Sequence, residues 1–95
     1  MSEQELIRRL CHCAIHYLLV LSEPLPHRPL VGEHVLAESL HACWTDAIFT
    51  SSNAALLAER VLGGVRSYRS GEKSLEQAVS DIQTIQREVE ERSVA

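Results

Sequence analysis

The chain has 95 residues, of which 45% are hydrophobic and 23% are charged, and its formal net charge is −4 at pH 7. This length suits a single helical domain over residues 1–95 with one modest core, and the composition excludes a chain that is disordered throughout. The acidic balance argues against a general nucleic-acid binder, which needs a concentrated basic face.

The first predicted helix covers residues 2–21 and opens with a capping box made by Ser2 and Glu5. Its apolar face is formed by Leu6, Leu10, Cys13, Tyr17, Val20 and Leu21. Its polar face is formed by Arg8, Arg9, His12 and His16. Ile15 and Leu19 fall at the boundary of the polar side, so the apolar arc is wider than one neighbouring helix needs.

The apolar run from Leu10 to Leu21 is the one segment that could be a membrane span or an export signal. It has about 12 residues, against roughly 20 for a membrane span, and no small-x-small cleavage site follows it. Three cysteines, an odd number without an export signal, indicate reduced thiols. The sequence therefore predicts a soluble cytoplasmic protein with no membrane partner.

A proline-rich connection over residues 22–32 leads to a second predicted helix over residues 33–49. Pro24, Pro26 and Pro29 disfavour helix at the residues before them, so this connection is expected to be extended. The inner face of the second helix is formed by Leu36, Leu40, Cys43, Trp44 and Ala47. Its opposite face is formed by His34, Glu38, His41 and Thr45.

Two further helices are predicted over residues 53–70 and 75–92. The first of them contains Gly63 and Gly64, which suggest a close helix approach or a kink, and Gly71 ends it. The last helix begins at a Ser74 cap, and its apolar stripe is formed by Leu75, Ala78, Val79, Ile82, Ile85 and Val89. The sequence thus predicts an all-α protein, a compact bundle of four amphipathic helices that are largely antiparallel.

Two clusters have residue types that can bind metal. His34, Glu38 and His41 stand at i, i+4 and i+7 on one helix face, and two imidazoles with a carboxylate can ligate zinc or another divalent metal. This face points away from the expected core and has no second copy, so a solvated helix face is the preferred interpretation. The second cluster is formed by Cys11, His12, Cys13 and His16. Cys11 and Cys13 project about 200° apart on a helix and cannot share one ion, and Arg8 and Arg9 lie beside the two histidines, where they would repel a cation.

No catalytic signature is present. The chain lacks a Gly-x-Ser-x-Gly elbow, a phosphate loop and a dinucleotide fingerprint. Cys13 and Cys43 lie on apolar stripes, where burial makes a thiol unreactive. The sequence therefore predicts neither an enzyme nor a bound cofactor.

Apolar residues on polar faces indicate an interaction protein. A monomer does not need all of its apolar residues to form its core. The surplus residues are Ile15, Leu19, Phe49 and Leu56. The prediction is a non-enzymatic interaction module of adaptor, chaperone or inhibitor type, and a homodimer whose interface includes Ile15, His16 and Leu19. The alternative is a metal-binding bundle that uses His34, Glu38 and His41.

Overall fold

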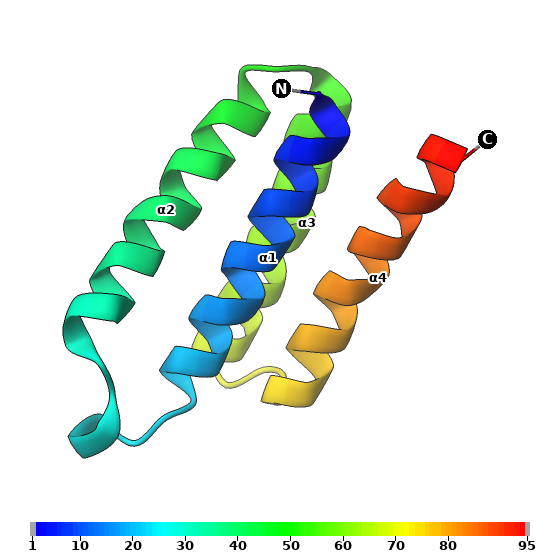
Figure 1. Ribbon diagram of the computed structural model, residues 1–95. Helices are drawn as coiled ribbons and strands as arrows, with labels where there is room; N and C mark the ends of the chain where they lie inside the picture. Colours follow the sequence, from blue (N-terminus) through cyan, green and yellow to red (C-terminus); the bar gives the residue numbers. More distant parts are fainter. Residues whose placement is uncertain (1, 95) are drawn as a thin grey trace.

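The computed structural model describes residues 2–94 as a bundle of four α-helices with one short 3-10 helix (Figure 1). This confirms the predicted all-α fold class. The elements in chain order are α1 (Glu3–Leu21), η1 (Leu25–His27), α2 (Leu30–Ile48), α3 (Ser52–Arg69) and α4 (Leu75–Val94).

The helices form a central pair with one helix on each side. In Figure 1, α1 lies in front of α3, α2 lies on one side of this pair, and α4 lies on the other. Helices that follow one another along the chain run in opposite directions. Within residues 2–94, α1 and α3 contact all the other helices, whereas α2 and α4 do not contact each other. The outer sides of α2 and α4 therefore have no neighbouring helix.

Local sequence explains where most helices begin and end. The Ser2, Ser51 and Ser74 hydroxyls each accept a hydrogen bond from the backbone N–H three residues on, at 3.2, 3.0 and 3.1 Å. Each of these bonds satisfies one of the N–H groups that the first turn of a helix leaves unpaired. Gly71 has φ 82°, the left-handed conformation expected of a glycine that follows a helix.

The connection between α1 and α2 differs from the prediction. It is not extended throughout, because it contains η1, and α2 begins at Leu30, directly after Pro29. Proline is compatible with the start of a helix, where its missing N–H group would have no partner in any case. Arg28 holds this connection, since its Nη2 donates to the carbonyl oxygens of Leu21 and Glu23 at 2.9 and 3.1 Å.

The core contains the expected stripe of α4, with Ala78, Ile82, Ile85 and Val89 buried. The prediction for α1 was wrong in one respect, because Cys11 is fully buried and Cys13 is only partly buried. α1 contacts three helices: α2 on one side, α4 on the other and α3 behind it. Its buried face is therefore wider than the face that a single neighbour would cover. This wider contact brings Cys11 into the core and moves Cys13 toward its edge.

Two contacts join α3 to α4. Gly64 is buried against Ile82, so the predicted close approach of helices occurs at this glycine. Arg60 Nη1 and Nη2 donate to the two carboxylate oxygens of Glu88 at 2.9 and 3.4 Å. The basic residues of α3 are thus matched in part by acidic residues of α4.

Within residues 2–94, none of the helices combines the length and the apolar content that crossing a bilayer requires.

Candidate functional site

The outer face of α2 is the most apolar helix face that the fold leaves uncovered. α2 has the highest mean apolar content of the four helices, and its apolar residues are the least confined to one face. Leu40 and Ala47 are its only buried residues. A helix that is apolar on all sides is usually covered on all sides. Here α1 and α3 cover one side alone.

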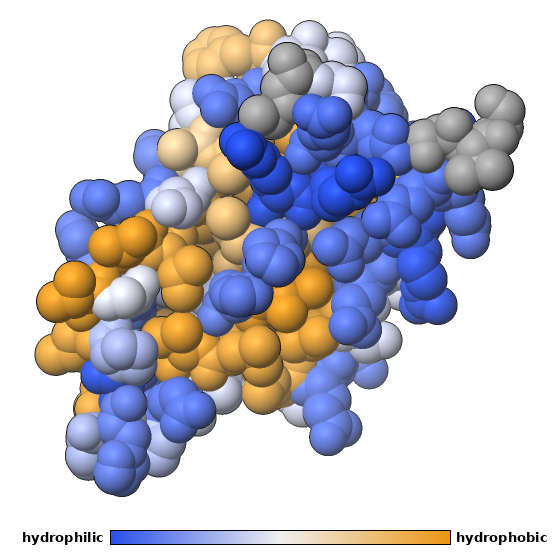
Figure 2. Space-filling view, in the orientation of Figure 1, coloured by the Kyte–Doolittle hydropathy of each residue, from blue (hydrophilic) through white to orange (hydrophobic). Residues whose placement is uncertain are grey.

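Large apolar side chains are concentrated on this uncovered face. Val31 is 80% exposed, Val35 is 53% exposed, and Phe49, which follows the last residue of α2, is 83% exposed. Leu30, also exposed, lies beside them in the first turn. Figure 2 shows the resulting hydrophobic area over the N-terminal half of α2 and its continuation toward the C-terminal half of α1.

The outward-facing residues of α2 follow a regular spacing. Alternating steps of four and three residues along the outer face define what we call the outer seam, formed by Val31, Val35, Glu38, Ala42, Thr45 and Phe49. All are exposed except Thr45, which is half-buried. The Thr45 hydroxyl donates to the His41 carbonyl oxygen at 2.9 Å, so its hydrogen-bonding needs are met within the helix. Steps of this kind keep one stripe of a helix facing a partner helix in a coiled coil.

The predicted metal ligands lie on this face but do not converge. His34 Nε2 lies 3.0 Å from Glu38 Oε1, whereas the His41 ring stacks on Trp44 with ring centres 5.8 Å apart. Trp44 in turn donates from its indole N–H to Glu59 of α3 at 3.1 Å. No group of three or more His, Cys, Asp or Glu side chains within residues 2–94 is placed to hold a metal ion.

The residues expected at a dimer interface on α1 lie in different surroundings. Ile15 is half-buried and packs against the core. His16 is exposed, and its ring stacks on that of His12 with centres 4.4 Å apart. Leu19 is 48% exposed. Leu19 is thus the only one of the three that offers a large free apolar surface.

Cys13 and Cys43 meet at the junction of α1 and α2. Both are partly buried and line one surface groove together with Arg8, Arg9 and His12. Burial and the neighbouring Cys13 thiol raise the pKa of Cys43, and the charge of Arg9 opposes this shift. Cys11 differs, because its full burial raises the pKa of its thiol to about 12. All three cysteines are free.

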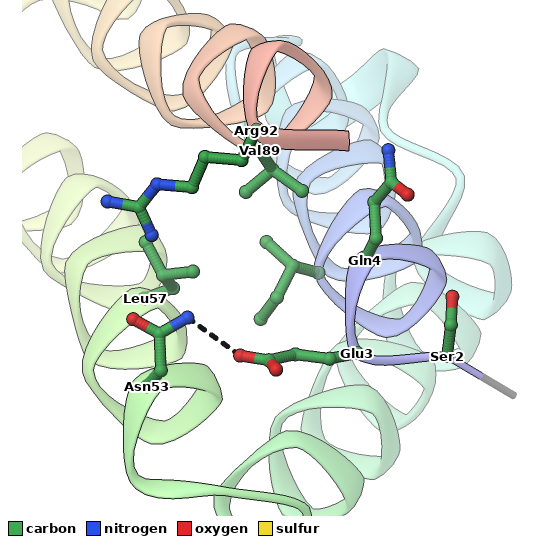
Figure 3. A pocket seen from close by; sticks show the side chains of 8 residues that line it. Ser2, Glu3, Gln4, Asn53, Leu57, Val89 and Arg92 are labelled. Atoms are coloured by element: carbon green, nitrogen blue, oxygen red, sulfur yellow. Dashed lines mark hydrogen bonds between the residues drawn. The ribbon is translucent and has the colours of Figure 1, made fainter. Parts of the chain in front are cut away.

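A second hollow opens where α1 begins (Figure 3). Leu57 and Val89 contribute to its apolar floor, and Arg92 extends from α4 toward α3 at its rim. Its one carboxylate, Glu3, already accepts a hydrogen bond from Asn53 at 2.7 Å. The hollow is lined by neither histidine nor cysteine, and it brings no cluster of titratable groups together.

The comparisons with known proteins give no further guide. No family model, no curated protein and no solved structure matches this chain.

Of the outer-seam residues, Phe49 is predicted from the sequence as surplus apolar surface, whereas Val31, Val35 and Ala42 are not. Val31 falls inside the connection that was expected to be extended, so it was not placed on a helix. The alternating steps of four and three residues are present in the sequence, and this spacing is the signal from which the outer seam could be predicted. The apolar stripe on the inner side of the same helix obscures this signal.

Proposed function

We propose that this protein is a non-enzymatic helical interaction module, of adaptor, chaperone or inhibitor type, that self-associates through the outer seam of α2. One observation carries the proposal: α2 and the residue after it expose Val31, Val35 and Phe49 on the side that α1 and α3 leave uncovered. Covering the outer seam with a second helix would remove its exposed side chains from water.

The arrangement of the outer seam favours a second copy in antiparallel orientation. If a two-fold axis passes through the level of Leu40, Val31 meets Phe49 of the second copy. The same symmetry places Val35 opposite Thr45, and Glu38 opposite Ala42. Apolar residues then lie at both ends of the pair, and the small Ala42 leaves room near its centre. A symmetric interface requires a surface that complements itself in this way.

The polar residues near the centre of the seam would set this register. Glu38 of one copy comes to the level of Ala42 and His41 of the other, so a carboxylate faces an imidazole on each side of the axis. Polar groups that face each other across an interface fix its orientation more than they add affinity. A polar residue in a helix seam likewise specifies register while lowering stability.

The energetics favour a dimer of modest affinity. Burying Val31, Val35 and Phe49 contributes roughly 1.5–3 kcal/mol for each side chain in each copy. Association opposes this gain with about 4–15 kcal/mol of lost freedom. The two ranges overlap, so these side chains alone favour only a weak dimer, populated at high micromolar concentrations and above.

The interface is assigned to α2 rather than to Ile15, His16 and Leu19. Ile15 already packs against the core, which removes much of the surplus apolar surface that first suggested α1. Leu19 remains exposed, and this makes it the matched control for the α2 assignment.

Sedimentation equilibrium tests the proposal. The wild-type chain is expected to sediment with a mass above that of one chain as its concentration is raised to several hundred micromolar. Val35→Glu is expected to shift it to the monomer, whereas Leu19→Glu, at a position of similar exposure on α1, is expected to leave the dimer intact. Circular dichroism checks that both variants keep their helices.

Two outcomes contradict the assignment. If Leu19→Glu dissociates the dimer and Val35→Glu does not, the interface lies on α1. If the wild type is monomeric at all accessible concentrations, it does not self-associate, and the outer seam would have to serve a different protein.

A further inference from the structure

The junction of α1 and α2 contains a pair of thiols that the proposed interaction does not use. Cys13 comes from α1 and Cys43 from α2, and both side chains are partly buried in one groove. The Cys13 thiol raises the pKa of Cys43, so the two groups also lie near enough to influence each other's charge. They are separated along the chain by the whole connection between the two helices, so a bond between them would add a second covalent link between α1 and α2.

The pair is accessible to a small reagent, because the groove that both cysteines line is open to solvent. Burial raises the pKa of Cys43 and the charge of Arg9 opposes this shift only in part, so reaction at this pair is expected to be faster at alkaline pH. Cys11 cannot take part, because it is fully buried and projects about 200° away from Cys13 around α1. Of the three cysteines, two are thus placed to react with each other and one is held apart.

We infer that Cys13 and Cys43 form a reversible oxidation site, at which a low-molecular-weight disulfide converts the two thiols into an interhelical disulfide. The thiolate of one cysteine attacks a sulfur of the small disulfide, forming a mixed disulfide and releasing one small thiol. The second cysteine, as its thiolate, then attacks the sulfur of the first. The Cys13–Cys43 bond forms, and a second small thiol leaves with the proton. The protein loses two hydrogens and the small disulfide is reduced to two thiols.

The bond would act on the least secured helix of the bundle. α2 contributes only two buried residues, Leu40 and Ala47, and has no contact with α4 within residues 2–94. Separation of α2 from α1 and α3 is therefore the opening that should require the least energy. A disulfide between Cys13 and Cys43 opposes it directly, and it also restricts the unfolded chain over the long segment between the two cysteines.

The test uses the full chain and oxidised glutathione as the probe. After equilibration with excess oxidised glutathione, the intact mass of the wild type is expected to fall by two hydrogens. The number of titratable thiols in the denatured protein should fall from three to one. The thermal midpoint is expected to rise by roughly 10 °C, and reduced glutathione should reverse all three changes.

Three variants identify the bond. Cys11→Ala is expected to lose two thiols, as the wild type does, whereas Cys13→Ser and Cys43→Ser should form no intramolecular disulfide. Cleavage after glutamate and fragmentation of the bridged peptides provide a second assignment that requires no substitution. The inference is overturned if the wild type keeps three free thiols, if it accumulates only glutathione adducts, or if a bridge persists in Cys13→Ser.

Discussion

A Cβ atom added to Gly64 would lie 3.3 Å from Cγ1 of Ile82, whereas one added to the neighbouring Gly63 would have no atom within 4 Å. The two glycines stand side by side in α3, and only one of them is needed for the contact with α4. Gly64 is thus kept small by packing, and Gly63 is not.

This difference predicts opposite effects of the same substitution. Gly63→Ala is expected to raise the free energy of unfolding by about 0.5–1 kcal/mol, because alanine favours a helix more than glycine does. Gly64→Ala gains the same helix propensity but crowds Ile82, so it is expected to be at least about 1 kcal/mol less stable than Gly63→Ala. Urea denaturation of both variants measures the difference. Equal stabilities would show that Ile82 moves aside freely.

Arg28 is predicted to secure the connection between α1 and α2. Its guanidinium donates to the Leu21 and Glu23 carbonyl oxygens, and Nη1 lies 3.8 Å from Glu33 Oε1 in the first turn of α2. Arg28→Gln is expected to lower the free energy of unfolding by about 1–3 kcal/mol, because hydrogen bonds from a charged group are lost at a part-buried position.

Arg66→Gln is the matched control for Arg28. Arg66 lies 3.6 Å from Glu59 at an exposed position, where an ion pair contributes about 0–1 kcal/mol. The prediction concerns the difference between the two variants in thermal or urea denaturation. If the Arg28 and Arg66 variants lose equally little stability, Arg28 does not secure the connection.

Glu88 is predicted to make stability depend on pH in the acidic range. The hydrogen bonds from Arg60 hold the pKa of this carboxyl below its ordinary value of 4.5. A carboxyl whose pKa is lower in the folded state stabilises the fold above its unfolded pKa, and this contribution is lost as the pH falls through the folded pKa. The wild type is therefore expected to exceed Glu88→Gln in thermal midpoint at pH 7, by an amount that shrinks as the pH falls below 4.5 and disappears once the folded-state carboxyl is protonated.

Thermal scans of both proteins from pH 7 to pH 3 check this expectation. Because the pair is exposed at the surface, the difference should also shrink as salt is added. A difference that is the same at pH 3 and pH 7 would mean that the charge of Glu88 does not contribute.

The sequence predicted the fold where local chemistry decides it. The Ser74 hydroxyl and the apolar stripe through Ile82 and Val89 lie within one helix, so capping and periodicity sufficed to place α4. α2 begins at Leu30 and not at residue 33, where it was predicted because the three prolines favour an extended connection up to residue 32. The hydrogen bonds of Arg28 to the end of α1 depend on tertiary structure and leave no local signal.

The candidate site was less accessible to prediction. Cys13 was predicted in the core, but Cys11 is the buried residue. The centre of a buried face depends on how many helices surround it, and a helical wheel does not contain that information. The outer seam of α2 follows a helical spacing that can be found in the sequence, but the inner apolar stripe of the same helix follows a helical spacing too. Only the arrangement of the four helices reveals which of the two stripes lacks a partner.

The distance between matching positions in two copies tests the antiparallel α2 pair most directly. Nitroxide labels on cysteines introduced at His34 or His41, in a chain that carries Cys13→Ser and Cys43→Ser, allow pulsed electron spin resonance to measure it. With the two-fold axis at Leu40, the two copies of position 41 are offset by only about 3 Å along the helix axis, and those of position 34 by about 18 Å. A short distance at 41 and a clearly longer one at 34 is the predicted result. Equal distances at the two positions, or no distance between subunits at all, would contradict the account.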